Sequence, residues 1–328
     1  MSKTAIITGV LGQDGSYLTE YLLELGYIVF GIHRRISTEG SGRFDNISSV
    51  INNPRLRLIP ADICDFQHMT FLIRDLKPTE FYSLAAMSHV GHSFSEEVLT
   101  HQTNATAVAA MLNAIAAYSP VTRFYQASTS ELYGGMSGLE RLSEDSPMRP
   151  NSPYAIAKLS AFHSARNYRE RKNGLFAVNG ILFNHESPRR GLDFAPRKIT
   201  RGVASIKLGL QNKLCMGNMT ARRDIGSAKE YVRGMHHLLS LGAPVDAVIA
   251  TGKAPSIWDL LEFVCHLADL KPEDVYQEDP RFMRPSDVQI LVGDNSKITS
   301  LGFHPKVKWE QTLQEMYEHD YNALLKGK

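Results

Sequence analysis

A tyrosine and a lysine four residues apart are the first candidates for chemistry in this sequence. Tyr154 and Lys158 follow Ser152-Pro153, a pair suited to begin a helix because serine caps a helix and proline fits its first position. Residues i and i+4 of a helix share one face, so the ammonium would lower the pKa of the phenol. The pattern predicts a tyrosine that acts as a base near neutral pH, although any amphipathic helix can contain this spacing.

A hydroxyl and a carboxylate come earlier in the chain. Thr129 follows a predicted strand at residues 123–128, and Glu131 lies two residues further on. A hydroxyl at the carboxyl end of a strand lies in the ligand crevice of an open α/β sheet. A simple alcohol oxidation does not require a carboxylate at the position of Glu131. Such a carboxylate suits a dehydration, in which one carboxylic group takes a proton and then protonates the leaving hydroxyl. A rim residue that binds a sugar hydroxyl is the alternative.

A glycine-rich turn follows the first predicted strand. Residues 9–15 read Gly-Val-Leu-Gly-Gln-Asp-Gly and lead into a predicted helix inside a strand–helix–strand unit. Such glycines allow a tight turn and close approach of the backbone to a pyrophosphate, which then faces the positive end of the helix. The turn predicts dinucleotide binding, although glycine alone at a strand–helix junction is weak evidence.

Basic residues follow the second predicted strand, where NAD-binding proteins usually place an acidic residue. The chain has His33-Arg34-Arg35 and then Ser37 at this point. Two guanidinium groups suit a 2′-phosphate, so we expect NADP rather than NAD, with a solvated basic loop as the alternative. Asp62 and Ile63 follow the third strand and are placed to contact the adenine.

The elements that must position these residues alternate along the first half of the chain. Strands are expected at 5–7, 27–32, 56–60, 80–85 and 123–128, and helices at 16–25, 69–76 and 98–118. This order predicts an α/β fold with a doubly wound parallel sheet, a Rossmann-like NADP domain. From about residue 184 the alternation of strands and helices becomes less regular. We therefore expect an NADP-binding domain at 1–183 and a smaller α/β substrate domain at 184–328, with segments crossing between them.

Composition excludes several classes of protein. The 328 residues carry 36 Lys+Arg against 34 Asp+Glu, a net charge of +2, which argues against a nucleic-acid or membrane-surface partner. The three cysteines, Cys64, Cys215 and Cys265, are far apart and favour a reducing compartment without a disulfide framework. No metal-ligand spacing occurs, and no run approaches ~18 apolar residues. We expect a cytoplasmic protein without a metal.

The sequence resembles the GDP-mannose 4,6-dehydratase family, a nucleotide-sugar branch of the extended short-chain dehydrogenases, over nearly the whole chain. The resemblance lies in residues 7–18, 31–35 and 124–134 and above all in 176–191, which read Phe-Ala-Val-Asn-Gly-Ile-Leu-Phe-Asn-His-Glu-Ser-Pro-Arg-Arg-Gly. It implies a lyase that converts GDP-mannose to GDP-4-keto-6-deoxymannose. A hydride leaves C4 for a tightly bound NADP, water is lost across C5–C6, and the hydride returns to C6.

The resemblance also implies residue roles. Thr129, Tyr154 and Lys158 match the catalytic triad, with Glu131 as the C5 base and C6 acid. The residues expected to bind the cofactor are Gly9, Gly12, Gln13, Asp14, Gly15, Arg34, Arg35, Asp62, Ile63, Leu84, Ala85, Ala86, Ser88, Lys158, His185 and Arg190. Those expected to bind the GDP-sugar are Ser88, Asn184, Lys198, Gly217, Arg223, Arg284 and Asp287. A homodimer or homotetramer is implied as well.

Four departures from the family pattern leave the sugar open. Leu99, Ile225, Ser227 and Asp287 replace residues that are usual in the family, and an insertion lies within residues 134–151. Three alternatives therefore stand beside GDP-mannose dehydration. They are dehydration of GDP-manno-heptose, reduction or epimerisation of a 4-keto sugar, and a catalytically silent NADP-binding protein.

Overall fold

The computed structural model describes residues 2–35, 42, 44–134, 141–171, 173–282 and 288–327. The chain divides into two compact units. Unit 1 comprises Met1–Gly134, Met148–Leu182 and Val232–Ala247, and unit 2 comprises Gly135–Pro147, Phe183–Tyr231 and Val248–Lys328. The expected site residues Arg284 and Asp287, as well as Ser37, lie outside the described residues.

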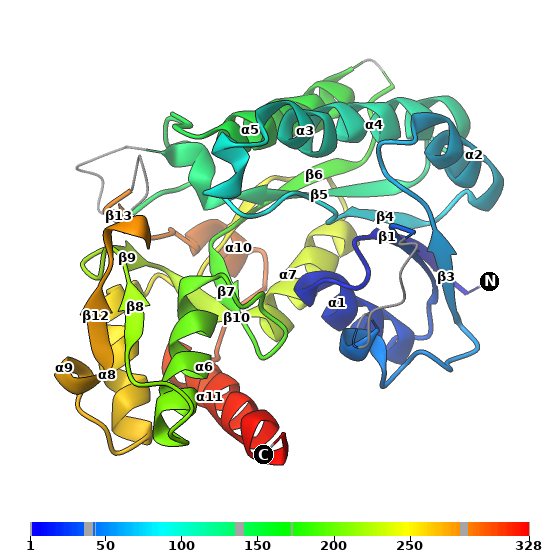
Figure 1. Cartoon of the computed structure of the whole chain (residues 1–328). Helices are drawn as coiled ribbons and strands as arrows, with labels where there is room; N and C mark the ends of the chain where they lie inside the picture. Colours follow the sequence, from blue (N-terminus) through cyan, green and yellow to red (C-terminus); the bar gives the residue numbers. More distant parts are fainter. Residues whose placement is uncertain are drawn as a thin grey trace. The chain divides into compact units, whose positions relative to one another are not determined.

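Unit 1 is built on a parallel sheet (Figure 1). Unit 1 contributes β1 (Thr4–Thr8), β2 (Ile28–His33), β3 (Leu56–Pro60), β4 (Glu80–Ser83), β5 (Arg123–Thr129) and β6 (Ala177–Leu182). The strand order is β11-β6-β5-β4-β1-β2-β3, and of β11 (Ala247–Ile249) only Ala247 belongs to unit 1. Every residue of β4 and β6 is buried, as expected for strands covered on both faces. The predicted doubly wound parallel fold is confirmed.

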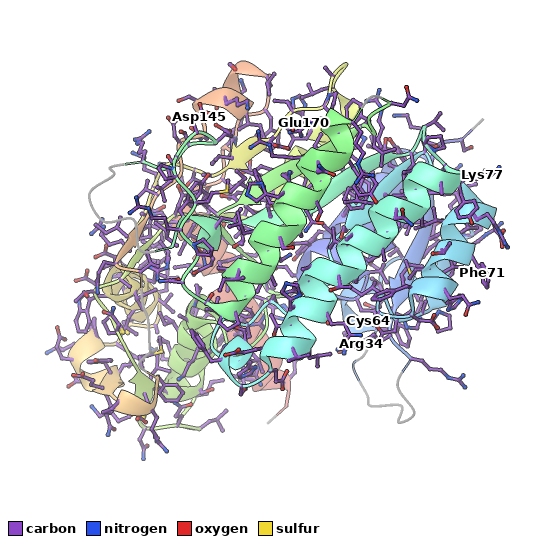
Figure 2. The ribbon with its side chains drawn as sticks, turned by 90° about the horizontal axis from the view of Figure 1, so that it is seen from above. Arg34, Cys64, Phe71, Lys77, Asp145 and Glu170 are labelled. Atoms are coloured by element: carbon purple, nitrogen blue, oxygen red, sulfur yellow. The ribbon has the colours of Figure 1, made fainter. Side chains whose placement is uncertain are left out.

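Helices cover both faces of this sheet. The main ones are α1 (Gln13–Glu24), α2 (Phe66–Leu76), α4 (Ala107–Tyr118), α5 (Pro153–Glu170) and the second half of α7 (Ala228–Ser240). In Figure 1, α2, α4 and α5 lie on one face and α1 and α7 on the other. Figure 2 shows α4 and α5 running side by side. The core between α4 and the sheet includes Phe81 stacked on Phe124, with ring centroids 5.5 Å apart.

The predicted helix at 98–118 is wrong in one respect, because it is not a single α-helix. It consists of α3 (Glu97–His101), a π-helical turn η3 (Gln102–Thr106), and α4. The turn carries Asn104, whose side-chain amide accepts a hydrogen bond from the Met87 N–H (2.9 Å) and donates one to the Met87 carbonyl (3.0 Å). The spacing of apolar residues could not predict this pairing, because it is made by a single polar side chain.

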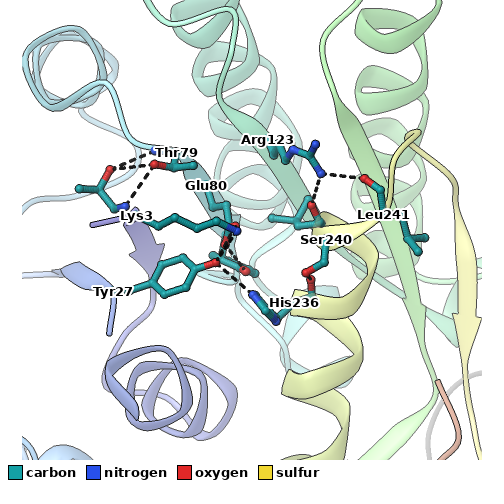
Figure 3. A network of polar contacts seen from close by, with 11 residues as sticks. Lys3, Tyr27, Thr79, Glu80, Arg123, His236, Ser240 and Leu241 are labelled. Atoms are coloured by element: carbon teal, nitrogen blue, oxygen red, sulfur yellow. Dashed lines mark hydrogen bonds and ion pairs between the residues drawn. The ribbon is translucent and has the colours of Figure 1, made fainter. Parts of the chain in front are cut away.

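A polar network lies at the start of β4 (Figure 3). Glu80, only 1% exposed, accepts hydrogen bonds from the hydroxyls of Tyr27 (2.9 Å) and Tyr82 (2.8 Å) and pairs with the Lys3 ammonium at 3.4 Å. His236 Nε2 of α7 lies 3.1 Å from the Tyr27 hydroxyl. The network therefore fastens the second half of α7 to the sheet of unit 1.

Unit 2 combines short strands with longer helices. Its parallel strand pairs are β7 (Asn184–Glu186) with β10 (Ile225–Ser227), β8 (Leu214–Met216) with β12 (Tyr276–Glu278), and β9 (Arg222–Arg223) with β13 (Ile290–Leu291). Its helices include α6 (Ala195–Lys207), α8 (Ile257–Leu267), α9 (Pro272–Val275), α10 (Ser296–Ser300) and α11 (Trp309–Lys326). A hydrophobic core joins α6, α8 and α11. Among the described helices of both units, none is long and apolar enough to cross a membrane.

Candidate active site

The glycine turn after β1 packs backbone against backbone. Gly9 has φ +72°, and a Cβ there would lie 3.0 Å from the Ala85 Cα. A Cβ on Gly15 would lie 2.2 Å from the Gly9 carbonyl oxygen. No side chain caps α1, which begins directly after Gly12. Its first backbone N–H groups therefore suit an anionic ligand, and the turn fits a dinucleotide pyrophosphate.

The segment after β4, Leu84–Ser88, lies beside this turn, where Ala85 packs against Gly9. The Thr8 hydroxyl oxygen accepts hydrogen bonds from the N–H groups of Leu84 (3.0 Å) and Ala85 (3.1 Å), while Asn104 holds Met87. Four expected cofactor contacts lie in this segment: Leu84, Ala85, Ala86 and Ser88. Thr8 and Asn104 were not predicted as site residues, because they fix the segment from 76 and 17 residues away in the sequence.

A hollow of about 660 Å³ lies beyond the end of β2. Its lining consists of Arg34, Arg35, Pro60, Ala61, Asp62, Asp65 and His68. Arg34 lies close to Cys64, as Figure 2 shows, and Asp62 accepts a hydrogen bond from the Cys64 N–H (2.9 Å). The structure thus brings both expected arginines to one hollow with Asp62. The Ile63 side chain packs in the hydrophobic core, and its proposed contact with the adenine would be made by its backbone.

Lys158 is a buried ammonium, only 4% exposed. Its Nζ donates a hydrogen bond of 2.8 Å to the Ala127 carbonyl and lies 5.9 Å from the centre of the Tyr154 ring. Burial lowers the pKa of Lys158 to about 8, and the Asp14 carboxylate opposes this shift. Since the Asp14 charge acts on Lys158, the glycine turn and the Tyr154–Lys158 pair belong to the same region of unit 1.

The start of α5 explains why Tyr154 lies where it does. Ser152 is the N-cap, and its hydroxyl accepts a hydrogen bond from the Ala155 N–H (3.2 Å), as the sequence predicts. The Tyr154 N–H donates to the Ser93 hydroxyl at 3.2 Å. Pro153 occupies the first helical turn. The predicted helix is confirmed, with Tyr154 and Lys158 one turn apart and both buried.

Thr129 and Glu131 lie at the carboxyl end of β5. Thr129 is the last residue of the strand, and its hydroxyl oxygen accepts a hydrogen bond from the Glu131 N–H (3.3 Å). Glu131 is half-buried in the 3-10 turn η4 (Ser130–Tyr133). Lys158 contacts Ala127 in the same strand. Thr129 and Glu131 thus lie at the end of β5 and the Lys158 ammonium contacts the same strand, at the edge where ligands bind open α/β sheets.

Unit 2 holds His185 in a defined orientation. His185 Nδ1 lies 2.7 Å from the Phe183 carbonyl oxygen, so this nitrogen carries the proton and donates. The ring stacks on Tyr231 with centroids 4.8 Å apart. Tyr231 packs so closely over Gly226 that a Cβ there would lie 2.3 Å from the ring. Asn184, the preceding site candidate, pairs with Ile225 across β7 and β10.

The other described substrate candidates also lie in unit 2. Lys198 Nζ is 3.1 Å from the centre of the Phe282 ring, and burial lowers the pKa of Lys198. Arg223 is 7% exposed, and its guanidinium donates to the Arg222 carbonyl at 3.0 Å. Gly217 is half-buried directly after β8. Two basic groups and a small residue are suitable for a diphosphate and a sugar.

Asp224, which was not predicted as a site residue, organises this part of unit 2. The carboxylate is fully buried and accepts hydrogen bonds from the Thr251 N–H (2.8 Å), the Thr251 hydroxyl (2.7 Å), the Gly252 N–H (2.7 Å) and the Gly293 N–H (3.1 Å). Burial raises the pKa of Asp224, and these donors oppose the shift. Asp224 thereby ties three loops together beside Arg223.

The parallel sheet, the glycine turn after β1 and the buried lysine one turn after a tyrosine define a Rossmann-fold protein of the short-chain dehydrogenase class. The family model for GDP-mannose 4,6 dehydratase matches residues 6–316, and the chain belongs to this family.

Curated relatives support this membership along the full length. A GDP-mannose 4,6-dehydratase of Yersinia enterocolitica is 41% identical over 99% of this chain and 97% of its own length, and one of Vibrio cholerae is 42% identical with the same coverage. A GDP-mannose 4,6 dehydratase of Cricetulus griseus is 40% identical over 98% of this chain and 92% of its own length.

Solved structures share the fold at lower identity. A UDP-glucose 4-epimerase of Thermotoga maritima superposes with a TM-score of 0.85 at 24% identity, covering 98% of this chain and 99% of that one. A dTDP-glucose 4,6-dehydratase of Bacillus anthracis, solved with NAD, gives 0.84 at 21% identity, covering 97% of this chain and 96% of that one. Since the fold is common to epimerases and dehydratases, the reaction must be argued from the site.

Proposed function

We propose that this chain is an NADP-dependent hydro-lyase that converts GDP-mannose to GDP-4-keto-6-deoxymannose. The observation that carries the proposal is Glu131, a half-buried carboxylate two residues beyond the candidate triad hydroxyl of Thr129, in a chain that belongs to the dehydratase family. A 4-keto-sugar reductase or epimerase has no step that removes a C5 proton and expels the C6 hydroxyl.

Several residues of unit 1 suit the cofactor. The glycine turn and the positive end of α1 suit the pyrophosphate, and Arg34 and Arg35 line a hollow where a 2′-phosphate can be bound by two guanidiniums. When bound, the nicotinamide supplies a hydride acceptor that takes the hydride from C4 and gives it back to C6. No net consumption of cofactor is therefore expected.

Tyr154 and Thr129 are proposed to act on the 4-hydroxyl of the sugar. The Tyr154 phenolate takes the hydroxyl proton as the C4–H bond breaks, and the Thr129 hydroxyl donates a hydrogen bond to the same oxygen. Lys158, held by its bond to the Ala127 carbonyl, favours the phenolate through its positive charge. A buried ammonium whose pKa is about 8 is largely charged at pH 7, which this role requires.

Glu131 is proposed to carry out the elimination. Oxidation at C4 makes the C5 proton acidic, and the Glu131 carboxylate removes it. The resulting carboxylic acid protonates the C6 hydroxyl, which leaves as water. After the hydride has returned to C6, C5 takes up a proton from solvent, and Tyr154 releases to solvent the proton that it took from the 4-hydroxyl, so that one water is lost and the oxidation state of the cofactor is unchanged.

Unit 2 is proposed to hold the sugar nucleotide and unit 1 the cofactor. Lys198 and Arg223 suit the diphosphate, whereas Asn184 and Gly217 suit uncharged parts of the ligand. Ser88 of unit 1 is a further proposed sugar contact. Arg284 and Asp287 complete the proposed set, and His185 and Arg190 are proposed to reach the cofactor. We also propose that the chain assembles as a homodimer or homotetramer.

Mass spectrometry of the reaction mixture tests this function. The protein is incubated with GDP-mannose and NADP present at far lower concentration than the sugar nucleotide. The expected product is lighter by one water, at many turnovers per NADP. GDP-manno-heptose is run in parallel. If GDP-mannose stays intact while GDP-manno-heptose is dehydrated, the reaction is the one proposed but the substrate is the heptose. Net oxidation of NADPH would favour a reductase.

A further inference from the structure

Ser93 lies in a tight turn of unit 1 that directly follows the segment Leu84–Ser88. The turn contains the 3-10 helix η2 (His92–Phe94). The Ser93 N–H donates to the His89 carbonyl (3.3 Å), and the His92 N–H donates to His89 Nδ1 (3.1 Å). The rings of the two histidines lie 4.0 Å apart. These contacts fix the backbone of the turn and, with it, the place of Ser93.

The Ser93 side chain is buried, and its hydroxyl is bonded on both sides. Ser93 is only 1% exposed. Its hydroxyl donates to the Val90 carbonyl (2.7 Å), and its oxygen accepts a hydrogen bond from the Tyr154 N–H (3.2 Å). Because a hydroxyl has one proton and two lone pairs, the bond to Val90 determines the directions in which the oxygen can accept. The turn therefore holds the backbone of Tyr154 across 61 residues of sequence.

The start of α5 explains why an acceptor is needed at this point. The first N–H groups of a helix have no carbonyl partner within it. Pro153 carries no N–H, and the N-cap Ser152 accepts from the Ala155 N–H. The Tyr154 N–H lies between these two positions and bonds to Ser93. Ser93 thus acts as a second cap, supplied by another segment, for the residue that carries the phenol.

A second anchor lies one helical turn further along α5. The Lys158 ammonium is bonded to the Ala127 carbonyl at 2.8 Å and lies 5.9 Å from the centre of the Tyr154 ring. Ser93 and Ala127 therefore hold the phenol and the ammonium from two different segments. The attraction between an ammonium and a phenolate decreases with their separation, so a small displacement of Tyr154 changes how strongly Lys158 favours the phenolate.

We infer that Ser93 is a positioning residue, which holds Tyr154 at the distance from Lys158 at which its phenolate is stabilised. The inference rests on the proposed function, in which Tyr154 takes the proton of the 4-hydroxyl. It goes further by giving a task in the reaction to a residue outside the expected triad. Since Ser88, a proposed sugar contact, directly precedes the turn, the same turn joins a segment proposed to contact the ligands to the proposed base.

Ultraviolet titration of Tyr154 tests the inference without relying on turnover. The phenolate absorbance of the full chain is followed from acid to alkaline pH, and the curve of the matching Tyr154→Phe protein is subtracted. In Ser93→Ala the midpoint should move to higher pH by at least about half a unit, because the displaced phenolate is less favoured by Lys158. The kcat for dehydration should fall about 10- to 100-fold, whereas Kd for NADP and KM for GDP-mannose should stay within about twofold.

Ser164→Ala is the matched control, since the exposed Ser164 hydroxyl of α5 also donates to a carbonyl, that of Ser160 at 2.9 Å. It should change neither the midpoint nor kcat. If Ser93→Ala does not fold, as judged by circular dichroism, Ser93→Cys takes its place, because a thiol has nearly the same size but is a weak acceptor. The same shift and the same fall in kcat are expected.

A wild-type midpoint in the Ser93 variant, with or without a fall in kcat, would overturn the inference. Failure of both Ser93 variants to fold would show that the bond serves stability alone and would overturn it as well. A shifted midpoint beside a wild type that dehydrates neither GDP-sugar would instead refute the proposed function and leave the positioning role intact.

Discussion

Lys158 Nζ donates a 2.8 Å hydrogen bond to the carbonyl oxygen of Ala127, two residues before Thr129 in β5. This single bond fixes the candidate ammonium of α5 against the strand that carries the candidate hydroxyl. Because both partners are buried, the bond also determines how far the ammonium lies from the Tyr154 ring. The proposed proton transfer from the 4-hydroxyl to Tyr154 depends on this arrangement.

The rate should fall on the alkaline side of neutrality. Burial lowers the pKa of Lys158 to about 8, so above this pH the ammonium loses its proton and no longer favours the Tyr154 phenolate. The kcat profile should therefore have a descending limb with a midpoint near pH 8. Lys158→Arg keeps its charge in this pH range. The pH profile of its residual activity should therefore lack the descending limb. A descending limb shared by both proteins would contradict the assignment.

Glu131→Gln should separate oxidation from elimination. The variant keeps Thr129, Tyr154 and Lys158, so hydride transfer from C4 can proceed, but no base removes the C5 proton. Dehydration should slow by about 10²–10⁴-fold. Stopped-flow absorbance should show reduced nicotinamide accumulating in the variant and not in wild type. Normal water loss by Glu131→Gln would assign the elimination to another group.

Arg34 and Arg35 should determine the choice of cofactor. Replacing both by alanine removes charge-assisted bonds of about 1.5–3 kcal/mol each, so the preference for NADP over NAD should fall at least about 100-fold. Affinity for NAD should change little. The measurement is the ratio of the two dissociation constants, with the exposed Arg55→Ala as the control. A wild-type protein that prefers NAD would contradict the role of both arginines.

His236 should make the stability of unit 1 depend on pH. Burial lowers the pKa of His236 below its usual 6.5. Below about pH 6.5 the unfolded chain therefore binds a proton that the folded chain resists, and stability falls as the pH drops toward the folded-state pKa. Urea unfolding at several pH values measures the loss. In His236→Gln the free energy of unfolding should decrease less as the pH is lowered from about 6.5. Identical pH dependence in the variant would exclude His236 as its source.

Asp224 should contribute strongly to the stability of unit 2. Asp224→Ala leaves three backbone N–H groups and one hydroxyl without their shared acceptor, so we expect a loss of about 3 kcal/mol or more in the free energy of unfolding. Urea unfolding followed by circular dichroism measures it. The exposed Asp75→Ala serves as the control, and a similar small loss in both variants would contradict this role.

Local patterns were sufficient to predict the strands β1 to β5 and the start of α5, whereas β6 and β11 were not predicted. The strands β1 and β2 are short runs rich in buried β-branched residues, and the Ser152-Pro153 pair marks the start of the helix directly. The triad candidates could be identified because their spacing follows helix and strand geometry. Asn104, Thr8 and Asp224 were missed because each acts through hydrogen bonds to segments remote in sequence. The short strand pairs of unit 2 carry too few residues for a periodic signal.

The most direct test of the central claim follows one hydrogen atom through the reaction. GDP-mannose carrying deuterium at C4 is incubated with the protein and a small amount of unlabelled NADP, and the product is analysed by mass spectrometry and NMR. The account predicts loss of one water, with the deuterium retained and found at C6. Unchanged GDP-mannose, or a dehydrated product without deuterium at C6, would contradict it.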